Sequence, residues 1–384
     1  MKRIKVSHLT SVHAYNDTRI FHKECVSLAQ AGYDVTLIAP VNTAFQEKEV
    51  TVLPVGTWSN RYYRFFVTIP RLLVKALKLK ASVYHFHDPE LLLAAPILRL
   101  FGARVIYDIH EDYITSIQQK SYIPALFRKV LASTLGLVEK AASALCYQVI
   151  AERYYRERFP DAVEILNYPI LPQCNDDSLM ELQCEREVKF NVQYAWCLYT
   201  GNVTLDRGAL LHLDLLKVHE HTAIAYIGKC SEEVAETIYL SADKEKISRQ
   251  RIKIIGIGRH VPRETIDYYT YSRHWLAGVA LFPETAHYAK KELTKFFEYM
   301  AAGLPILSSN FPVWRNVIEK NKCGLCANPI DLQSIVKAID FLLSNPDEAA
   351  VMGENGRKAV NEKYNWSFEE KKLLNLYKTV SDRG

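Results

Sequence analysis

The sequence predicts an α/β protein with two domains, each built on a parallel sheet covered by helices. A length of 384 residues exceeds what one typical hydrophobic core organises. Near the N-terminus, apolar strands at 4–9 and 35–39 flank an amphipathic helix at 19–31. A second strand–helix series begins at 196, beyond a linker candidate at 169–185 that has little periodicity. The expected domain bounds are 1–175, with a returning C-terminal helix at 367–384, and 186–366.

The composition is that of an ordinary globular protein, with 49% hydrophobic and 24% charged residues. A net charge of +5 is too mild to indicate nucleic acid as a partner. The opening MKRIKVSHLT has no signal-peptide core, and no stretch approaches the ~18 apolar residues that span a bilayer. We therefore expect a cytoplasmic protein, or one that lies on the inner face of the membrane. The eight cysteines are expected as thiols, and Cys323–Cys326 is a lone C-x-x-C without a second pair.

The loop after the first strand carries polar side chains instead of a glycine-rich dinucleotide motif. It contains His13 and Asp17, and Arg19 begins the next helix. A loop at the carboxyl edge of a first strand faces a cleft in such domains, so these three residues are candidates for binding an acceptor. For Asp17 the alternative is a capping role at the N-terminus of the following helix.

Residues 61–80, RYYRFFVTIPRLLVKALKLK, form the most basic stretch of the chain. Its apolar side chains recur at helical spacing with arginines and lysines between them, although Pro70 argues against one long helix. A basic amphipathic helix with aromatic residues can lie on an anionic membrane surface. The alternative is a helix that packs on the core and exposes a charged face.

Two further strands of the first half end in ionisable residues. The strand at 83–87 ends in His87, and Asp88-Pro89-Glu90 then has the cap, proline and acid typical of a helix start. The strand at 105–109 ends in His110-Glu111-Asp112. Several ionisable groups at the carboxyl edge of a parallel strand indicate a functional site. For His87 the alternative is a partly buried ring that is satisfied by a helix cap.

Three strands of the second half end in glycine with a cation nearby. Gly201-Asn202 follows the strand at 196–200 and leads to Arg207, Gly228-Lys229 follows the next strand, and Gly256 to Arg259 follows the third. Tight glycine turns let backbone amides approach a phosphate, and loops at one edge of a parallel sheet share a crevice. The pattern predicts an anion site.

The stretch 290–310, KKELTKFFEYMAAGLPILSSN, is the most informative part of the sequence. Thr294 is the expected N-cap of a helix that Gly303 closes. The N-terminus of this helix, with amides from Glu292 through Leu293 to Lys295, attracts phosphate. Glu298, one turn further, can accept hydrogen bonds from two ribose hydroxyls. The alternative is a plain amphipathic helix with Lys295 and Glu298 as a surface pair.

The run KFFEYMAAGLP at 295–305 resembles the nucleotide-sugar motif of retaining GT-B glycosyltransferases of family 4. DTRIF from Asp17, HDPELL around Asp88 (87–92) and YDIHED around Asp108 (107–112) are similar to a bacterial branch of that family that builds surface polysaccharides. The resemblance implies a GT-B fold, with two Rossmann-like domains facing a central cleft. It implies transfer of a sugar, with retention, from a nucleotide sugar, expected to be a UDP-sugar, to a glycan or lipid-linked glycan in capsule, exopolysaccharide or O-antigen synthesis.

The resemblance also implies roles for single residues, with the donor bound by the second domain and the acceptor by the first. The implied catalytic residues are His110, which touches the donor sugar, and Arg207 and Lys295, which meet the charge of the leaving diphosphate. The donor-binding residues are Gly201, Asn202, Lys229, Arg259, Leu293, Thr294 and Glu298. The acceptor-binding residues are His13, Asp17, Arg19 and Glu111. No D-x-D triplet is present, so neither a metal nor another cofactor is expected beside the donor.

The sequence departs from the family pattern at two positions. Lys290 stands where many members have a first Glu, and Asn202 stands where members carry a cation that Lys229 or Lys295 could replace. These departures leave open a non-catalytic subunit with the same fold, and a nucleotide-sugar epimerase is a further alternative to a hexosyltransferase-type enzyme. The nucleotide, sugar, acceptor, linkage and oligomeric state are not determined by the sequence.

Overall fold

A computed structural model describes residues 3–57, 60–110, 114, 117, 124–171, 190–271, 275–285 and 287–382. The chain forms two compact units. The first comprises residues 1–170 and 366–384, and the second comprises residues 171–365. Most of the linker predicted at 169–185 lies outside the described residues. None of the described helices is both long enough and apolar enough to cross a bilayer.

The first unit is built on a sheet with the strand order β3-β4-β2-β1-β5-β6-β7-β8. Its neighbouring strands pair in parallel except for β3 and β4, which form an antiparallel edge. The strands are β1 (Lys5–Leu9), β2 (Asp34–Ala39), β3 (Phe45–Glu47), β4 (Val50–Pro54), β5 (Val83–Phe86), β6 (Arg104–Ile109), β7 (Tyr147–Ile150) and β8 (Val163–Glu164). The parallel α/β architecture expected from the first strand–helix–strand unit is confirmed.

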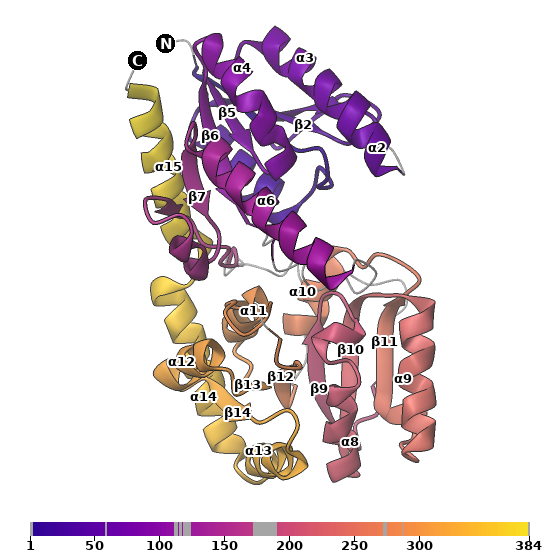
Figure 1. The fold of residues 1–384 in the computed structure, drawn as a ribbon. Helices are drawn as coiled ribbons and strands as arrows, with labels where there is room; N and C mark the ends of the chain where they lie inside the picture. Colours follow the sequence, from indigo (N-terminus) through magenta and orange to yellow (C-terminus); the bar gives the residue numbers. More distant parts are fainter. Residues whose placement is uncertain are drawn as a thin grey trace. The chain divides into compact units, whose positions relative to one another are not determined.

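Helices cover both faces of this sheet (Figure 1). They are the π-helix η1 (Thr18–Cys25), α1 (Val26–Gln30), α2 (Arg61–Tyr63), the π-helix η2 (Arg64–Thr68), α3 (Ile69–Leu79), η3 (Pro89–Ala94), α4 (Ala95–Leu100), α6 (Ala125–Ser143), η4 (Arg153–Glu157) and α15 (Trp366–Asp382). Side chains alternate between two cores, so that Leu37 packs with η1 and α15 on one face while Ile38 packs with α3, η3 and α4 on the other. The helix predicted at 19–31 is thus a π-helix that continues as α1.

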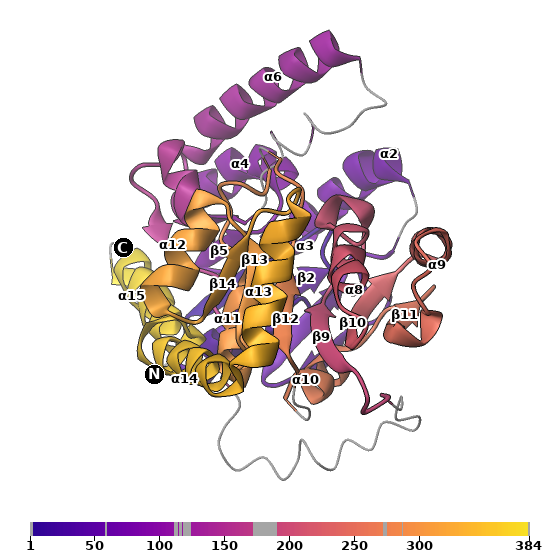
Figure 2. The ribbon, with the colours of Figure 1, turned by 90° about the horizontal axis from the view of Figure 1, so that it is seen from below.

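The second unit has a sheet of entirely parallel strands in the order β11-β10-β9-β12-β13-β14. The strands are β9 (Ala195–Thr200), β10 (Thr222–Cys230), β11 (Ile252–Ile257), β12 (Ala277–Ala280), β13 (Ile306–Ser309) and β14 (Gly324–Ala327). The helices are η5 (Leu205–Arg207), η6 (Leu211–Leu213), α8 (Asp214–Val218), α9 (Glu232–Lys244), η7 (Arg249–Arg251), α10 (Arg263–Tyr271), α11 (Thr294–Ala302), α12 (Pro312–Asn321), α13 (Leu332–Ser344) and α14 (Pro346–Lys363). Figure 2 shows α8 and α13 together on one face of this sheet.

The chain leaves the second unit at a short break between α14 and α15. The Asn365 side chain donates to the carbonyl oxygens of Val360 (2.7 Å) and Asn361 (3.1 Å) and so satisfies the end of α14. The Trp366 amide then donates to Pro169 O at 2.8 Å, and its indole N–H donates to Ser27 Oγ at 2.9 Å. These bonds attach the start of α15 to the first unit.

Candidate active site

Glycine allows the strand ends of the second unit to pack backbone against backbone. Gly201 has φ 89° and Gly228 has φ 154°, both in the region that favours glycine. A Cβ on Gly228 would lie 2.0 Å from Gly201 O, and a Cβ on Gly256 would lie 2.2 Å from Gly228 O. The three glycine-bearing strand ends therefore lie side by side at the carboxyl edge of this sheet.

Lys295 lies at the same edge, in the first turn of α11. Its Nζ donates to Thr200 O at 3.1 Å and lies 3.5 Å from the centre of the Tyr199 ring. Burial lowers the pKa of this ammonium well below its usual range, and the neighbouring charge of Arg207 lowers it further. Within the described part of the chain, Lys295 forms no ion pair with a carboxylate. A buried cation beside a second cation creates a strong preference for an anion.

Arg207 is placed by a tight turn. The chain reverses at Gly208, with φ 80°, where a Cβ would lie 1.8 Å from Leu281 O. Tyr288, which donates a 2.6 Å hydrogen bond to Asp206, interacts with the Arg207 guanidinium. The sequence analysis did not identify Tyr288 or Asp206, because neither residue is part of a motif and the two lie 82 positions apart in the chain.

Glu298 is held by an arginine that the sequence analysis missed. Arg263, the first residue of α10, forms an ion pair with Glu298 and a 2.7 Å ion pair with Asp267. Burial acts to lower the pKa of Arg263, but the Glu298 and Asp267 charges raise it overall. The alternative of a surface pair between Lys295 and Glu298 is wrong, because Lys295 turns inward to Thr200. The Arg263 ion pair thus fixes the position of the Glu298 carboxylate one turn into α11.

The start of α11 differs by one residue from the prediction. Leu293, with φ −75° and ψ 124°, occupies the cap position and makes no side-chain capping bond. Thr294 is the first helical residue, so the prediction that it is the N-cap is wrong. Gly303 closes the helix in the left-handed region with φ 71°, as predicted. The Phe296 amide donates to Leu293 O at 3.0 Å, and the amides before it are those that a helix N-terminus offers to an anion.

The other donor-site candidates are more exposed. Lys229 lies in an irregular part of β10, and Arg259 follows Gly258 beyond β11, both with exposed side chains. Asn202 is also exposed, and its carbonyl oxygen accepts a 3.0 Å hydrogen bond from Tyr199 OH. That bond links the Asn202 loop to the ring against which Lys295 packs.

In the first unit, His110 is oriented by Asp108. His110 Nδ1 lies 3.1 Å from Asp108 Oδ2. Burial acts to lower the pKa of His110, but the hydrogen bond to Asp108 and its charge raise the pKa overall. Arg19 donates to both oxygens of Asp108, at 2.8 and 2.7 Å, and is 3% exposed. The expectation that Arg19 contacts an acceptor is therefore corrected: its guanidinium belongs to the core.

His13 joins this group from the first loop. His13 Nε2 lies 3.1 Å from His110 Nε2 and 3.4 Å from Asp88 Oδ1. Asp88 makes no capping bond to its own helix with its side chain and instead accepts from Thr10 Oγ1 (3.0 Å) and the Ser11 amide (2.6 Å). The capping role expected for the Asp88 side chain is thus wrong, because the first loop provides its donors.

The remaining acceptor-site candidates have different outcomes. Asp17 caps η1 by accepting from the amides of Arg19 (2.8 Å) and Ile20 (3.0 Å), as its alternative interpretation predicted. Glu111 lies outside the described residues. His87 is fully buried and bonds to Asp108, so it is not the partly buried, cap-satisfied ring of the alternative interpretation.

Two family models match the chain, one in each unit. The model of the glycosyl transferase 4-like domain matches residues 18–166, and that of glycosyl transferases group 1 matches residues 293–359. A curated relative, the GDP-mannose-dependent alpha-(1-6)-phosphatidylinositol monomannoside mannosyltransferase of Mycobacterium tuberculosis, is 30% identical over 81 residues. That match covers 21% of this chain and 21% of the relative.

Several solved structures share the fold over the whole chain. Sucrose-phosphate synthase of Thermosynechococcus elongatus has a TM-score of 0.76 at 16% identity, with 100% of both chains covered. HepE of Anabaena, in complex with UDP and glucose, has a TM-score of 0.73 at 10% identity, covering 98% of this chain and 100% of HepE. WaaG, a glycosyltransferase involved in lipopolysaccharide biosynthesis, has a TM-score of 0.68 at 14% identity and covers 96% of this chain and 98% of its own. At these identities the likeness concerns the fold alone.

Proposed function

We propose that this chain, whose two units match the models of the glycosyl transferase 4-like domain and of glycosyl transferases group 1, transfers a sugar from a nucleotide sugar to a glycan acceptor with retention at the anomeric carbon. The observation that carries this proposal is the pair of cations Lys295 and Arg207 beside the start of α11. Lys295 forms no salt bridge within the described residues, and burial and the charge of Arg207 lower its pKa more than the charge of Glu298 raises it. A diphosphate is an anion of the charge and shape that such a centre binds.

In the proposed reaction, the bond between the anomeric carbon and the diphosphate oxygen breaks, and negative charge grows on the leaving group. Lys295, Arg207 and the free amides of α11 stabilise that charge. An anion next to Lys295 also favours its protonated form, so the cation is strongest when the charge develops. The leaving phosphate accepts the proton of the acceptor hydroxyl, which then bonds to the anomeric carbon from the same side. The family resemblance assigns the positioning of the sugar to His110, whose Nδ1 lies 3.1 Å from Asp108 Oδ2.

We propose a UDP-sugar as the donor. HepE, which shares the fold, was solved with UDP and with UDP-glucose, whereas the short match to the mycobacterial relative points to GDP-mannose. Glu298, fixed by Arg263, accepts hydrogen bonds from the ribose hydroxyls. Because both nucleotides carry this ribose and diphosphate, the base and sugar must be distinguished by experiment.

Thermal unfolding with a panel of nucleotide sugars tests the donor. We expect UDP-sugars to raise the melting temperature, because a ligand that binds only the folded state stabilises it by mass action. A larger shift with GDP-mannose would replace the proposed nucleotide and leave the transferase intact. No shift with any nucleotide, together with no sugar transfer, would favour a non-catalytic subunit. Donor epimerisation without an acceptor would favour an epimerase.

We propose further that the acceptor is a lipid-linked glycan of a surface polysaccharide and that the first unit rests on an anionic membrane surface. The segment 61–80 forms α2, η2 and α3 in continuous helical turns, with Leu72 and Ala76 buried. Its first half exposes Tyr62 (68%) and Phe66 (71%). Side chains of this size at high exposure, next to basic residues, support membrane contact.

Pelleting with anionic liposomes tests the membrane proposal. Arg64 pairs with Glu90 at 2.8 Å, so the charges to neutralise are those of Arg71, Lys75 and Lys78. We expect the triple variant Arg71→Gln, Lys75→Gln, Lys78→Gln to pellet less at low salt. Lys244, Lys246 and Lys337 of the second unit, all exposed and all changed to Gln, provide the control for total charge. Equal pelleting of all proteins would exclude this segment as the contact.

A further inference from the structure

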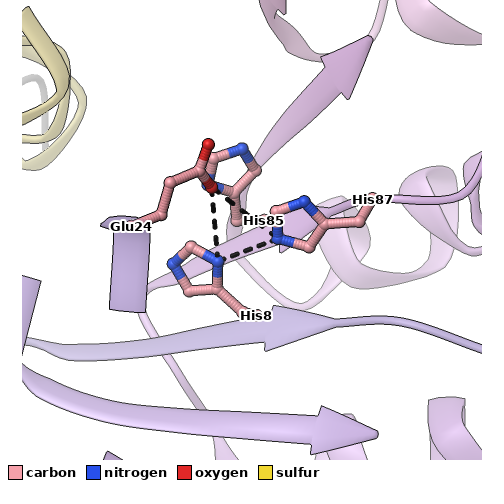
Figure 3. Close-up of side chains that lie close together, drawn as sticks. All are labelled: His8, Glu24, His85 and His87. Carbon is pink, nitrogen blue, oxygen red and sulfur yellow. Dashed lines mark hydrogen bonds and ion pairs between the residues drawn. The ribbon is translucent and has the colours of Figure 1, made fainter. Parts of the chain in front are cut away.

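Three histidines and a glutamate form a closed group inside the first unit (Figure 3). His8 on β1 and His85 on β5 are paired in register, so their side chains leave the sheet on the same face. His87, two residues further on, lies on that face too, and Glu24 comes from η1 above it. All four side chains are buried, at 1% exposure or less. We call this group the histidine cluster.

The carboxylate of Glu24 lies at nearly equal distances from the three rings. Its Oε2 is 3.8 Å from His8 Nδ1, 3.7 Å from His85 Nδ1 and 3.9 Å from His87 Nε2. These separations are too long for hydrogen bonds. In a tetrahedral zinc site, ligand bonds of about 2.0–2.2 Å place two ligand atoms roughly 3.3–3.6 Å apart, so the separations around Oε2 need to shorten by only a few tenths of an ångström. The four ligand atoms all lie within 4.8 Å of one another.

The cluster also contains polar atoms without hydrogen-bond partners. Both oxygens of Glu24 and Nε2 of His85 are buried without one, and Arg19 reaches only the other carboxylate oxygen, at 3.2 Å. No ring nitrogen lies within hydrogen-bond distance of Oε2, since His85 Nδ1, at 3.7 Å, is the nearest of the three. Buried groups left in this state are costly, and a cation among the ring nitrogens and Oε2 removes that cost.

We propose that the histidine cluster binds one Zn²⁺ ion through His8 Nδ1, His85 Nδ1, His87 Nε2 and Glu24 Oε2. Neutral imidazole and carboxylate are the donors that zinc accepts, and four protein ligands make a closed, structural site. Two contacts must open for the ion to enter: the 2.9 Å approach of His8 Nδ1 to His87 Nε2, and the 2.9 Å hydrogen bond between His85 Nδ1 and Tyr377 OH. The ion would join β1, β5 and η1 at the centre of the sheet.

Two of the ligands already have the outer contacts typical of metal-bound histidines. His87 presents its other nitrogen to Asp108 at 3.3 Å, and His8 presents its other nitrogen to Tyr377 OH at 3.1 Å. Such contacts hold the ring orientation and the tautomer. Through Asp108 the cluster is connected to His110, and through Tyr377 to α15.

A second group of three, His87, Asp108 and His110, also has donor atoms within reach of one another. It is a weaker candidate because Asp108 is already neutralised by both nitrogens of Arg19. A cation placed there would also lie next to the guanidinium. Arg19 also approaches Glu24, but it reaches one oxygen only, at 3.2 Å, and leaves Oε2 available to a ligand.

Metal analysis of the full chain tests the proposal. We expect the protein, purified without chelator from zinc-supplemented cells, to contain about one zinc per chain. Glu24→Gln and His85→Gln should lose most of it. His212→Gln, which removes another fully buried histidine far from the cluster in sequence, should keep the metal.

Cobalt provides a test that does not depend on the variants folding. Chelator-treated wild-type protein titrated with Co²⁺ should develop the intense visible absorption of a tetrahedral site, and Zn²⁺ should abolish it. Chelation should also lower the melting temperature of the wild type but not of Glu24→Gln. Folded wild-type protein that is purified without zinc and takes up neither metal would overturn the proposal and leave a hydrogen-bonded histidine network. Because no nucleotide takes part, the outcome is independent of the proposed transferase activity.

Discussion

The two units treat buried charge in opposite ways. In the second unit, Lys295 lies beside Arg207 and has no carboxylate partner within the described residues. In the first unit, Arg19 is surrounded by acceptors from Asp108, Glu24 and the Ile165 carbonyl. An uncompensated cation needs a ligand, whereas a fully paired cation holds a fold together. A buried cation therefore predicts a binding role where it lacks an ion pair, as at Lys295, and a structural role where it is fully paired, as at Arg19.

The largest expected effect is that of Arg19→Met, which should lower the free energy of unfolding. It leaves Asp108 buried without its bidentate partner, which costs about 3–5 kcal/mol. Urea unfolding of the variant measures this loss. Arg207→Met is the matched control and should leave the free energy of unfolding close to that of the wild type. Comparable losses in both variants would contradict the distinction between the two units.

The next largest expected effect is that of Lys295→Ala, which should lower the rate of turnover. Loss of one group that stabilises developing charge typically lowers kcat by about 10²–10³-fold. The melting temperature of the ligand-free variant should stay close to that of the wild type. A buried ammonium without its anion is costly to the folded state, so its removal carries little penalty in stability. Lys320→Ala, at an exposed position of α12, is the control. Unchanged sugar transfer by Lys295→Ala would exclude it from the site.

Glu298→Gln should weaken donor binding more than turnover. Hydrogen bonds to charged groups contribute about 1.5–3 kcal/mol, which corresponds to a rise of roughly ten- to hundredfold in the donor KM. Glu264→Gln, an exposed carboxylate next to Arg263, should bind the donor like the wild type. A fall in kcat alone, at unchanged KM, would remove Glu298 from ribose binding.

The smallest effect concerns pH and His110. Its pKa is raised in the folded protein, because the attraction of Asp108 outweighs burial. The contribution to stability is therefore present below the ordinary histidine pKa of about 6.5 and is lost as pH rises through the raised value. The stability difference between wild type and His110→Gln should be larger at low pH than at high pH. A difference that grows with pH would contradict the ion pair.

The local features of the site were predictable from the sequence. Gly303 ends α11 in the left-handed region because glycine alone has no Cβ to oppose it, and alternating apolar segments predicted both parallel sheets. The one-residue error at Thr294 has a local cause too. Leu293 takes the extended cap conformation, and threonine is tolerated as the first helical residue.

The pairing of charges could not be read from the chain. Arg263 meets Glu298 across 35 positions, Arg19 meets Asp108 across 89, and Tyr377 meets His8 across 369. Residue spacing carries information over one or two turns of a helix, but these contacts depend on how whole elements pack. Sequence therefore specified which elements form and where glycine bends them, and tertiary packing alone decided which charges are neutralised and which remain for a ligand.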